Sequence, residues 1–214
     1  MKSEVRYKVV GPVETNCYLL INTETKQAVV IDPGHSGEFL AQRIKELGVT
    51  VDTVLLTHGH FDHIGGIDAM REIMEIHVIA GENEKGLLAD PEANCSHWIS
   101  ANGFSVKVDQ FVRDGEILNI AGFDIKCIET PGHTAGGMCF YIESEKLLFA
   151  GDTLFYHSFG RTDLPTGSLS DLIKSIKNKI MVLPEDTRVL CGHGEETTIA
   201  DEIKYNPVFE YCSR

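Results

Sequence analysis

The sequence lacks any apolar run near the roughly 20 residues that a membrane-spanning helix needs. Residues 1–7 also lack the apolar core of a secretion signal. We therefore expect a cytoplasmic protein that has no membrane partner.

Positive charge is scarce, because 19 Lys and Arg residues stand against 32 Asp and Glu residues, for a formal net charge of −13. Binding to nucleic acid requires Lys and Arg concentrated on one face, where they displace counterions from phosphates. The composition therefore argues against a nucleic-acid partner.

Closely spaced cysteines are also missing. The chain has six cysteines and no pair at C-x-x-C spacing, which argues against a disulfide framework and a structural zinc knuckle. One alternative stays open: Cys191 lies two residues before His193 and could supply a sulfur ligand. The G-x-S-x-G motif of serine hydrolases is absent as well, so no such nucleophile is expected.

What the chain does contain is a large share of hydrophobic residues, 43% of 214, and no stretch that resembles a linker. We therefore predict a single domain over residues 1–214. Strands are predicted over residues 5–10, 17–22, 28–31, 51–56, 76–80, 117–120, 123–129, 138–143, 146–150 and 187–191. Helices are predicted over residues 37–47, 67–74, 82–102, 169–183 and 199–205. Two sheets packed face to face with helices outside would bury these runs, which predicts an α+β fold.

The strongest chemical signal follows the predicted strand 51–56. His58, His60, Asp62 and His63 fall within six residues. Alternate residues of an extended segment point the same way, so the first three can converge. Imidazole and carboxylate together suit zinc, iron or manganese better than calcium or magnesium.

Three later strands end in the same manner, each followed by a glycine and one residue of ligand type. These residues are His133, Asp152 and His193, and Asp32 similarly follows the strand 28–31. Strand ends that meet at one edge of a sandwich would form a cleft lined with metal ligands.

The motifs H-x-H-x-D-H, T-P-G-H-T, G-D-T-L-F and G-H-G resemble those of the metallo-β-lactamase superfamily. Within it, the chain is similar to the glyoxalase II (hydroxyacylglutathione hydrolase) branch, in a single-domain form. The resemblance implies a four-layer αββα sandwich. It implies one metal held by His58, His60 and His133, a second held by Asp62, His63 and His193, and Asp152 bridging both. By the same resemblance, Asp32 orients ligands without binding metal.

The resemblance further implies a metal-dependent hydrolase with two divalent ions, zinc first, with iron or manganese as alternatives. The expected partner is a small-molecule acyl thioester similar to hydroxyacylglutathione. Attack would come from a hydroxide shared by the two metals, and Asp62 and Asp152 are the expected catalytic residues. The oligomeric state is left open.

The segment that follows Asp152 departs from the glyoxalase II pattern. Arg161 keeps a positive charge that could meet substrate, but Asp163 does not suit an anionic peptide, and an internal ion pair between the two is the alternative. Tyr156 and Phe159 are candidates for the acyl pocket. Residues 160–163 also resemble persulfide dioxygenases of this fold, which hold one iron through two His and one Asp. An iron-dependent persulfide dioxygenase is therefore the alternative function.

Overall fold

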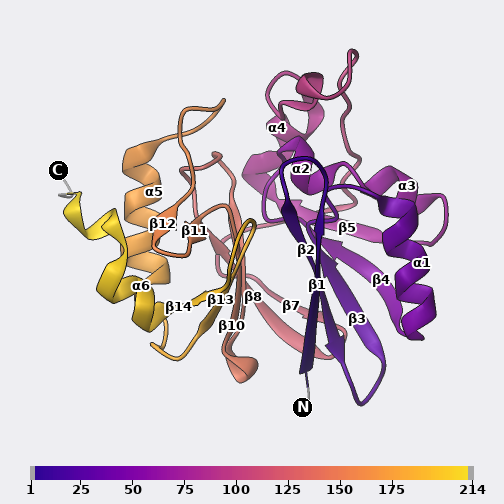
Figure 1. Ribbon diagram of the computed structural model, residues 1–214, viewed down its shortest axis with the longest axis horizontal. Coiled ribbons are helices and arrows are strands. Elements are labelled where there is room, and N and C mark those ends of the chain that lie inside the picture. Colours follow the sequence, from indigo (N-terminus) through magenta and orange to yellow (C-terminus); the bar gives the residue numbers. More distant parts are fainter. Residues whose placement is uncertain (1–2, 212–214) are drawn as a thin grey trace.

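The computed structural model describes residues 3–211 and contains two large sheets that face each other (Figure 1). In the first sheet the strands follow sequence order. They are β1 (Ser3–Val10), β2 (Thr15–Asn22), β3 (Gln27–Ile31), β4 (Thr50–Leu55), β5 (His77–Gly81) and β6 (Gln110–Val112). β1 to β3 pair in antiparallel fashion, whereas β3 to β6 run parallel.

The second sheet has the order β14-β13-β10-β9-β8-β7. Its strands are β7 (Ile117–Ile120), β8 (Phe123–Glu129), β9 (Met138–Ile142), β10 (Leu147–Gly151), β13 (Arg188–Cys191) and β14 (Thr197–Thr198). β10 and β13 are parallel, and the other neighbours are antiparallel. The short strands β11 (Leu154–Phe155) and β12 (Ser158–Phe159) form a separate hairpin.

Helices cover the two outer faces. α1 (Gly37–Leu47) and α3 (Ile67–Arg71) lie on the first sheet, while α5 (Leu169–Ser175) and α6 (Ile199–Tyr205) lie on the second (Figure 1). The predicted α+β fold, a four-layer αββα sandwich, is thereby confirmed. The short helices α2 (Phe61–Ile64) and α4 (Lys85–Ala89) lie near the edge where many strands end (Figure 1).

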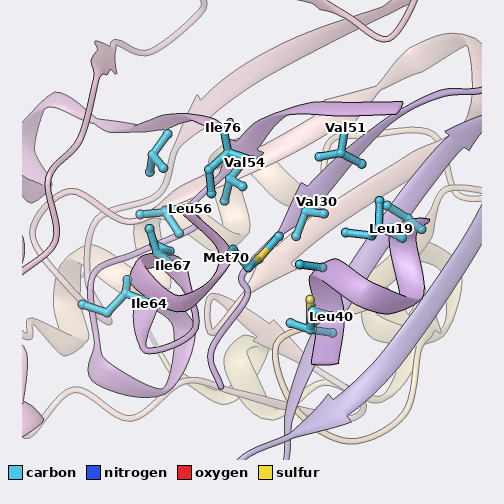
Figure 2. Packing of buried hydrophobic residues seen from close by; sticks show 14 of the residues in the cluster. Leu19, Val30, Leu40, Val51, Val54, Leu56, Ile64, Ile67, Met70 and Ile76 are labelled. Carbon is cyan, nitrogen blue, oxygen red and sulfur yellow. The ribbon is translucent and has the colours of Figure 1, made fainter. Parts of the chain in front are cut away.

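Three hydrophobic clusters hold these layers together. The central one joins both sheets, with Leu20 from the first and Phe140 and Phe149 from the second. An outer cluster packs α1 and α3 against the first sheet, where Val30 and Leu40 lie on the same side of the sheet (Figure 2). The third packs α5 and α6 against the second sheet. Each sheet is thus apolar on both faces, which explains why its central strands are continuous hydrophobic runs.

Most predicted elements are found close to their predicted bounds, and α1 matches its prediction at both ends. Gly48 ends this helix with a φ of 65°, and its N–H bonds the Lys45 carbonyl. A residue without a β-carbon adopts this left-handed conformation at little cost.

The predicted helix over residues 82–102 is confirmed only at its start, over residues 82–89, and is wrong beyond them. A short turn precedes α4, and the chain then leaves the helical path at Asp90, directly before Pro91. Proline disfavours helical backbone in the residue before it and cannot donate a helical hydrogen bond. The side chain of Asn94 then donates to the Phe104 carbonyl and folds the segment into a compact loop.

Two further differences concern strand and helix ends. The sequence did not predict β6, which has three residues. In the helix predicted over 169–183, α5 ends at Ser175 and the chain continues as a π-helical turn to Ile180. Of the six cysteines, Cys212 lies outside the described residues, and so do residues 1 and 2, which were considered in the search for a secretion signal. The extent of the domain over 1–214 stays a prediction. Among residues 3–211, no helix is long and apolar enough to cross a membrane.

Candidate metal centre

The strand ends deliver the predicted ligands to one place. Within each of three overlapping groups in the described chain, the possible ligand atoms all lie within 4.8 Å of one another. The groups are His58, His60 and His133; His58, His63 and Asp152; and Asp62, His63 and His193. β3, β4 and β5 are parallel, so their carboxyl ends share an edge, and β10 and β13 end together in the facing sheet. All seven predicted ligands are therefore close together.

Asp152 lies between the two outer groups. Its Oδ2 is 3.7 Å from His133 Nε2 and 3.5 Å from His193 Nε2, while its Oδ1 is 3.4 Å from His63 Nε2. On one side, His60 Nδ1 and His133 Nε2 are 3.0 Å apart. On the other, His193 Nε2 is 3.2 Å from Asp62 Oδ2. One carboxylate thus touches donor atoms that belong to both sides.

Several donor atoms at this site are buried without a hydrogen-bond partner. They are the Nε2 atoms of His58, His60 and His63, and Oδ1 of Asp152. Buried polar atoms are nearly always paired in folded proteins, so an unpaired cluster needs an explanation. Divalent cations would satisfy these atoms together, and nitrogen and carboxylate donors suit zinc, iron and manganese. The donor set fits a metal centre.

Hydrogen bonds on the opposite ring nitrogens fix which nitrogen each histidine offers. His63 Nδ1 lies 2.9 Å from Asp32 Oδ2, and His133 Nδ1 lies 2.7 Å from the Arg161 carbonyl oxygen. Both oxygens are acceptors, so each Nδ1 carries the proton and donates. The Nε2 atoms of these two rings therefore face the site, as a metal ligand requires.

Asp32 has the orienting contacts that its sequence position suggested. Besides His63, its two oxygens accept from the Thr57 hydroxyl at 2.6 Å and from the Thr57 N–H at 2.8 Å. The residue is buried and has a φ of 53°, a backbone conformation that is uncommon outside glycine. Asp32 therefore connects the end of β3 to Thr57, the residue directly before the ligand candidate His58.

The titration behaviour of the site follows from burial and from its neighbours. Burial, together with the adjacent imidazoles, lowers the pKa of His58 well below its ordinary value and that of His60 to about 3. Burial alone would raise the pKa of Asp62, but His63 and His193 lower it below its ordinary value. Burial alone would lower the pKa of His63 and of His193, but Asp62 and Asp152 raise it above its ordinary value. A divalent metal would therefore displace a proton from each of these two rings.

Each of the three residues suggested for substrate binding has a partner within the protein, and their role stays a prediction. The Arg161 guanidinium donates to both carboxylate oxygens of Asp163, at 2.7 and 2.8 Å, which is the ion-pair alternative. Tyr156 stacks on His157 with ring centroids 3.9 Å apart, and Phe159 packs against Tyr211. The aromatic side chain found beside a ligand is Phe155, whose ring centroid is 6.1 Å from that of His193. Sequence reasoning missed it because β11 is too short to show periodicity.

Cys191 does not join the ligands. Its side chain belongs to the hydrophobic cluster behind the second sheet, and burial raises the pKa of its thiol to about 12. None of the ligand groups found among residues 3–211 includes a cysteine. Leu190 belongs to the central cluster and Cys191 to the outer one, because successive side chains of β13 point to opposite faces. β13 ends at Cys191, so His193 lies beyond the strand, where the chain turns toward the other ligands.

Glu84 is a buried carboxylate that the sequence reasoning missed. One of its oxygens accepts from Gly59 N–H at 2.9 Å and the other from Gly136 N–H at 2.8 Å. Gly59 lies between two ligands, and Gly136 follows His133 by three residues. The signal was present in the sequence, because Glu84 follows the end of β5 at the edge where the ligands gather.

Glu84→Ala is expected to lower the free energy of unfolding by about 1–3 kcal/mol, because two buried N–H groups lose their acceptor. It should also weaken metal binding at the group containing His60 and His133 about 10–100-fold, as loss of a supporting contact typically does. Denaturant titration and competitive metal titration measure the two effects.

Glu82→Ala is the matched control, because Glu82 is an exposed residue two positions away whose carboxylate pairs with Arg113. Equal losses in the two variants would contradict the positioning role of Glu84.

Glu202 holds the segment after β11 in a similar way. This fully buried carboxylate accepts from His157 N–H at 3.0 Å, from the Thr197 hydroxyl at 2.6 Å and from Asn206 Nδ2 at 2.6 Å. Asn206 Nδ2 also donates to the Ser158 carbonyl. The hairpin that carries Phe155 is thereby anchored to α6.

Comparison with known proteins agrees with this arrangement. The sequence model of the Metallo-beta-lactamase superfamily matches residues 10–193. The chain is 42% identical over 200 residues to the probable metallo-hydrolase YqgX of Bacillus subtilis (strain 168), covering 92% of this chain and 93% of that protein. It is 37% identical over 196 residues to the hydroxyacylglutathione hydrolase GloC of Haemophilus influenzae, covering 91% of this chain and 92% of GloC.

Solved structures are also similar. The crystal structure of BLEG-1 B3 metallo-beta-lactamase matches with a TM-score of 0.90 and 40% identity, over 95% of this chain and 98% of that one. TTHA1623 in a di-iron-bound form matches with a TM-score of 0.81 and 31% identity, over 94% and 98% of the two chains. ETHE1 from Myxococcus xanthus matches with a TM-score of 0.79 and 29% identity, over 95% and 83%. The chain therefore belongs to the metallo-β-lactamase superfamily of metallo-hydrolases.

Proposed function

We propose that this chain is a dinuclear metal-dependent hydrolase that cleaves small acyl thioesters, with zinc as the expected metal. The observation that carries the proposal is the pair of three-residue ligand groups on either side of Asp152. His58, His60 and His133 would hold one ion, and Asp62, His63 and His193 the other. Asp152 would contact both.

Two divalent ions in such a site lower the pKa of a shared water and polarise a carbonyl group. The chain's own part is to present the imidazole and carboxylate donors and to fix their orientation. Asp32 does this through His63, and Glu84 through the backbone at Gly59 and Gly136. A thioester suits this arrangement because its thiolate leaving group, with a thiol pKa of about 8.5 by analogy with cysteine, needs little protonation. The departure of the thiolate therefore needs no general acid.

Similarity to known proteins supports the proposal. GloC is described as a hydroxyacylglutathione hydrolase, and TTHA1623 binds two irons in a fold that matches along nearly the whole chain. A small-molecule thioester remains the proposed partner, and zinc, iron or manganese the proposed metal. The acidic net charge of −13 favours neither a nucleic acid nor a polyanion as substrate.

The second candidate function is a persulfide dioxygenase that uses one iron. The similarity to ETHE1 from Myxococcus xanthus favours it, and so does the pattern of residues 160–163. A mononuclear site would need only one of the two ligand groups. The second group is nevertheless complete, with His193 Nε2 at 3.2 Å from Asp62 Oδ2, and this favours the hydrolase.

A parallel assay tests the two functions. Purified protein is offered a panel of acyl-glutathione and acyl-coenzyme A thioesters, and thiol release is followed by a chromogenic disulfide. The same preparation is offered glutathione persulfide in an oxygen electrode. Thioester cleavage without oxygen uptake supports the hydrolase, whereas persulfide-dependent oxygen uptake without thioester cleavage overturns it.

Asp163→Asn is expected to lower KM for an anionic thioester about threefold to fivefold, with kcat unchanged. The exposed ion pair that it breaks contributes about 0.2–1 kcal/mol, and the freed Arg161 guanidinium can then meet the substrate. Steady-state kinetics with an anionic and an uncharged thioester measure the effect. An equal change in KM for both substrates would show that Arg161 does not meet substrate charge.

A further inference from the structure

A cavity of about 350 Å³ lies on the outer side of the first sheet, between β1, β2 and α1. Its walls include Cys17, Leu19 and Val30 from the sheet and Leu40 and Ile44 from α1, all of them buried. Leu19, Val30 and Leu40 lie near one another on this side of the sheet (Figure 2). Ligand pockets typically measure about 300–1,000 Å³ and are mostly apolar, so this space suits a small apolar group.

The charged residues that line the cavity are all basic. Among the described residues that line it, the charged ones are Arg6, Lys8 and Arg43, and none is acidic. Glu4 and Glu46 pair with Arg6 and Arg43 but lie outside the lining, and among the described ion pairs none involves Lys8. Electrostatic complementarity therefore favours an anion at this opening.

A ligand carboxylate can compete for the three cations with their present partners. Arg6 pairs with Glu4 at 2.7 Å, and Arg43 pairs with Glu46, but both pairs are exposed to solvent. Lys8 lies over the Phe39 ring, with Nζ 6.0 Å from the centroid. Exposed ion pairs of this kind contribute little to stability, so a ligand carboxylate can replace the two glutamates at a small cost in free energy.

We propose that this cavity binds a medium-chain fatty acid anion, with the alkyl chain among Leu19, Val30, Leu40 and Ile44 and the carboxylate between Lys8 and Arg43. Protein interiors are close-packed, so an apolar space of this size between a helix and a sheet favours an apolar occupant. A single carboxylate would pair with the cations at the opening, and the alkyl chain would lie against the apolar walls.

The cavity is separate from the candidate metal centre. None of its lining residues belongs to the metal-ligand groups, which lie at the edge where the strands end. The proposal therefore goes beyond the proposed function, and its test does not depend on catalysis.

Isothermal titration of the metal-loaded protein with decanoate, below its micelle concentration, tests the proposal. We expect one saturable site, with affinity falling about fourfold for each CH₂ removed in octanoate and hexanoate. Lys8→Glu is expected to weaken decanoate about tenfold, because it reverses a charge at the mouth. Absence of saturable binding, or equal affinity for hexanoate and decanoate, would overturn the proposal.

Lys107→Glu is the matched control, because it makes the same charge change at a lysine whose side chain is 83% exposed and lies outside the cavity. It should bind decanoate like the parent protein. If Lys8→Glu also binds like the parent, decanoate occupies another site, such as the metals, and the proposal is wrong.

Discussion

His60→Ala is expected to lower kcat/KM for thioester hydrolysis by about 10³-fold while the chain stays folded, as loss of a strong electrostatic stabiliser does. His60 is buried, its Nε2 has no hydrogen-bond partner, and its Nδ1 faces His133 Nε2 at 3.0 Å. Its removal deletes one of three donors from the first group. Steady-state kinetics, elemental mass spectrometry and circular dichroism measure activity, metal content and folding.

His77→Ala is the matched control, since His77 is exposed at the start of β5 and belongs to none of the ligand groups. Its activity and metal content should equal those of the parent protein. Full activity of His60→Ala with normal metal content would refute the assignment of His60 as a ligand.

Metal removal is the second change with a large expected effect. Treatment with a chelator should abolish hydrolysis, and titration back should restore it at about two equivalents per chain, because two complete donor groups flank Asp152. The metal-free protein should also unfold at a lower temperature. Binding to the native state alone stabilises it by about 2.7 kcal/mol when free metal is 100 times Kd.

Elemental mass spectrometry on freshly purified protein gives the starting composition, and scanning calorimetry gives the stability difference. One iron per chain, with activity restored at one equivalent, would contradict the dinuclear hydrolase and favour the dioxygenase. Full activity after complete metal removal would contradict both functions.

The sequence alone predicted the fold class, which the structure confirms, and the residues that the structure brings close together at the candidate metal centre. The central strands are apolar on both faces, so their runs are easily recognised. Four strands (β4, β8, β10 and β13) are followed by a turn in which a glycine stands beside a candidate ligand. Periodicity also placed α1 at its observed bounds, because a glycine ends it. These are local signals, carried by residues that are neighbours in the chain.

Short and irregular segments could not be predicted in the same way. Residues 82–102 contain enough apolar residues to suggest a helix, but Pro91 and the contacts of Asn94 decide the loop. β6 and the β11–β12 hairpin are too short for a periodic pattern, so their pairing depends on strands distant in the chain. Phe155, which lies beside His193, was missed for this reason.

The sequence by itself therefore determined which residue types are available for a metal centre and at which strand ends they lie. Only the tertiary structure decided which of them meet. It places Asp152 between two donor groups, joins Arg161 to Asp163, and bonds Glu84 to two glycines 25 and 52 residues away. Ligand types and strand ends are written in local sequence, whereas such contacts depend on how the two sheets pack, a property of the whole chain.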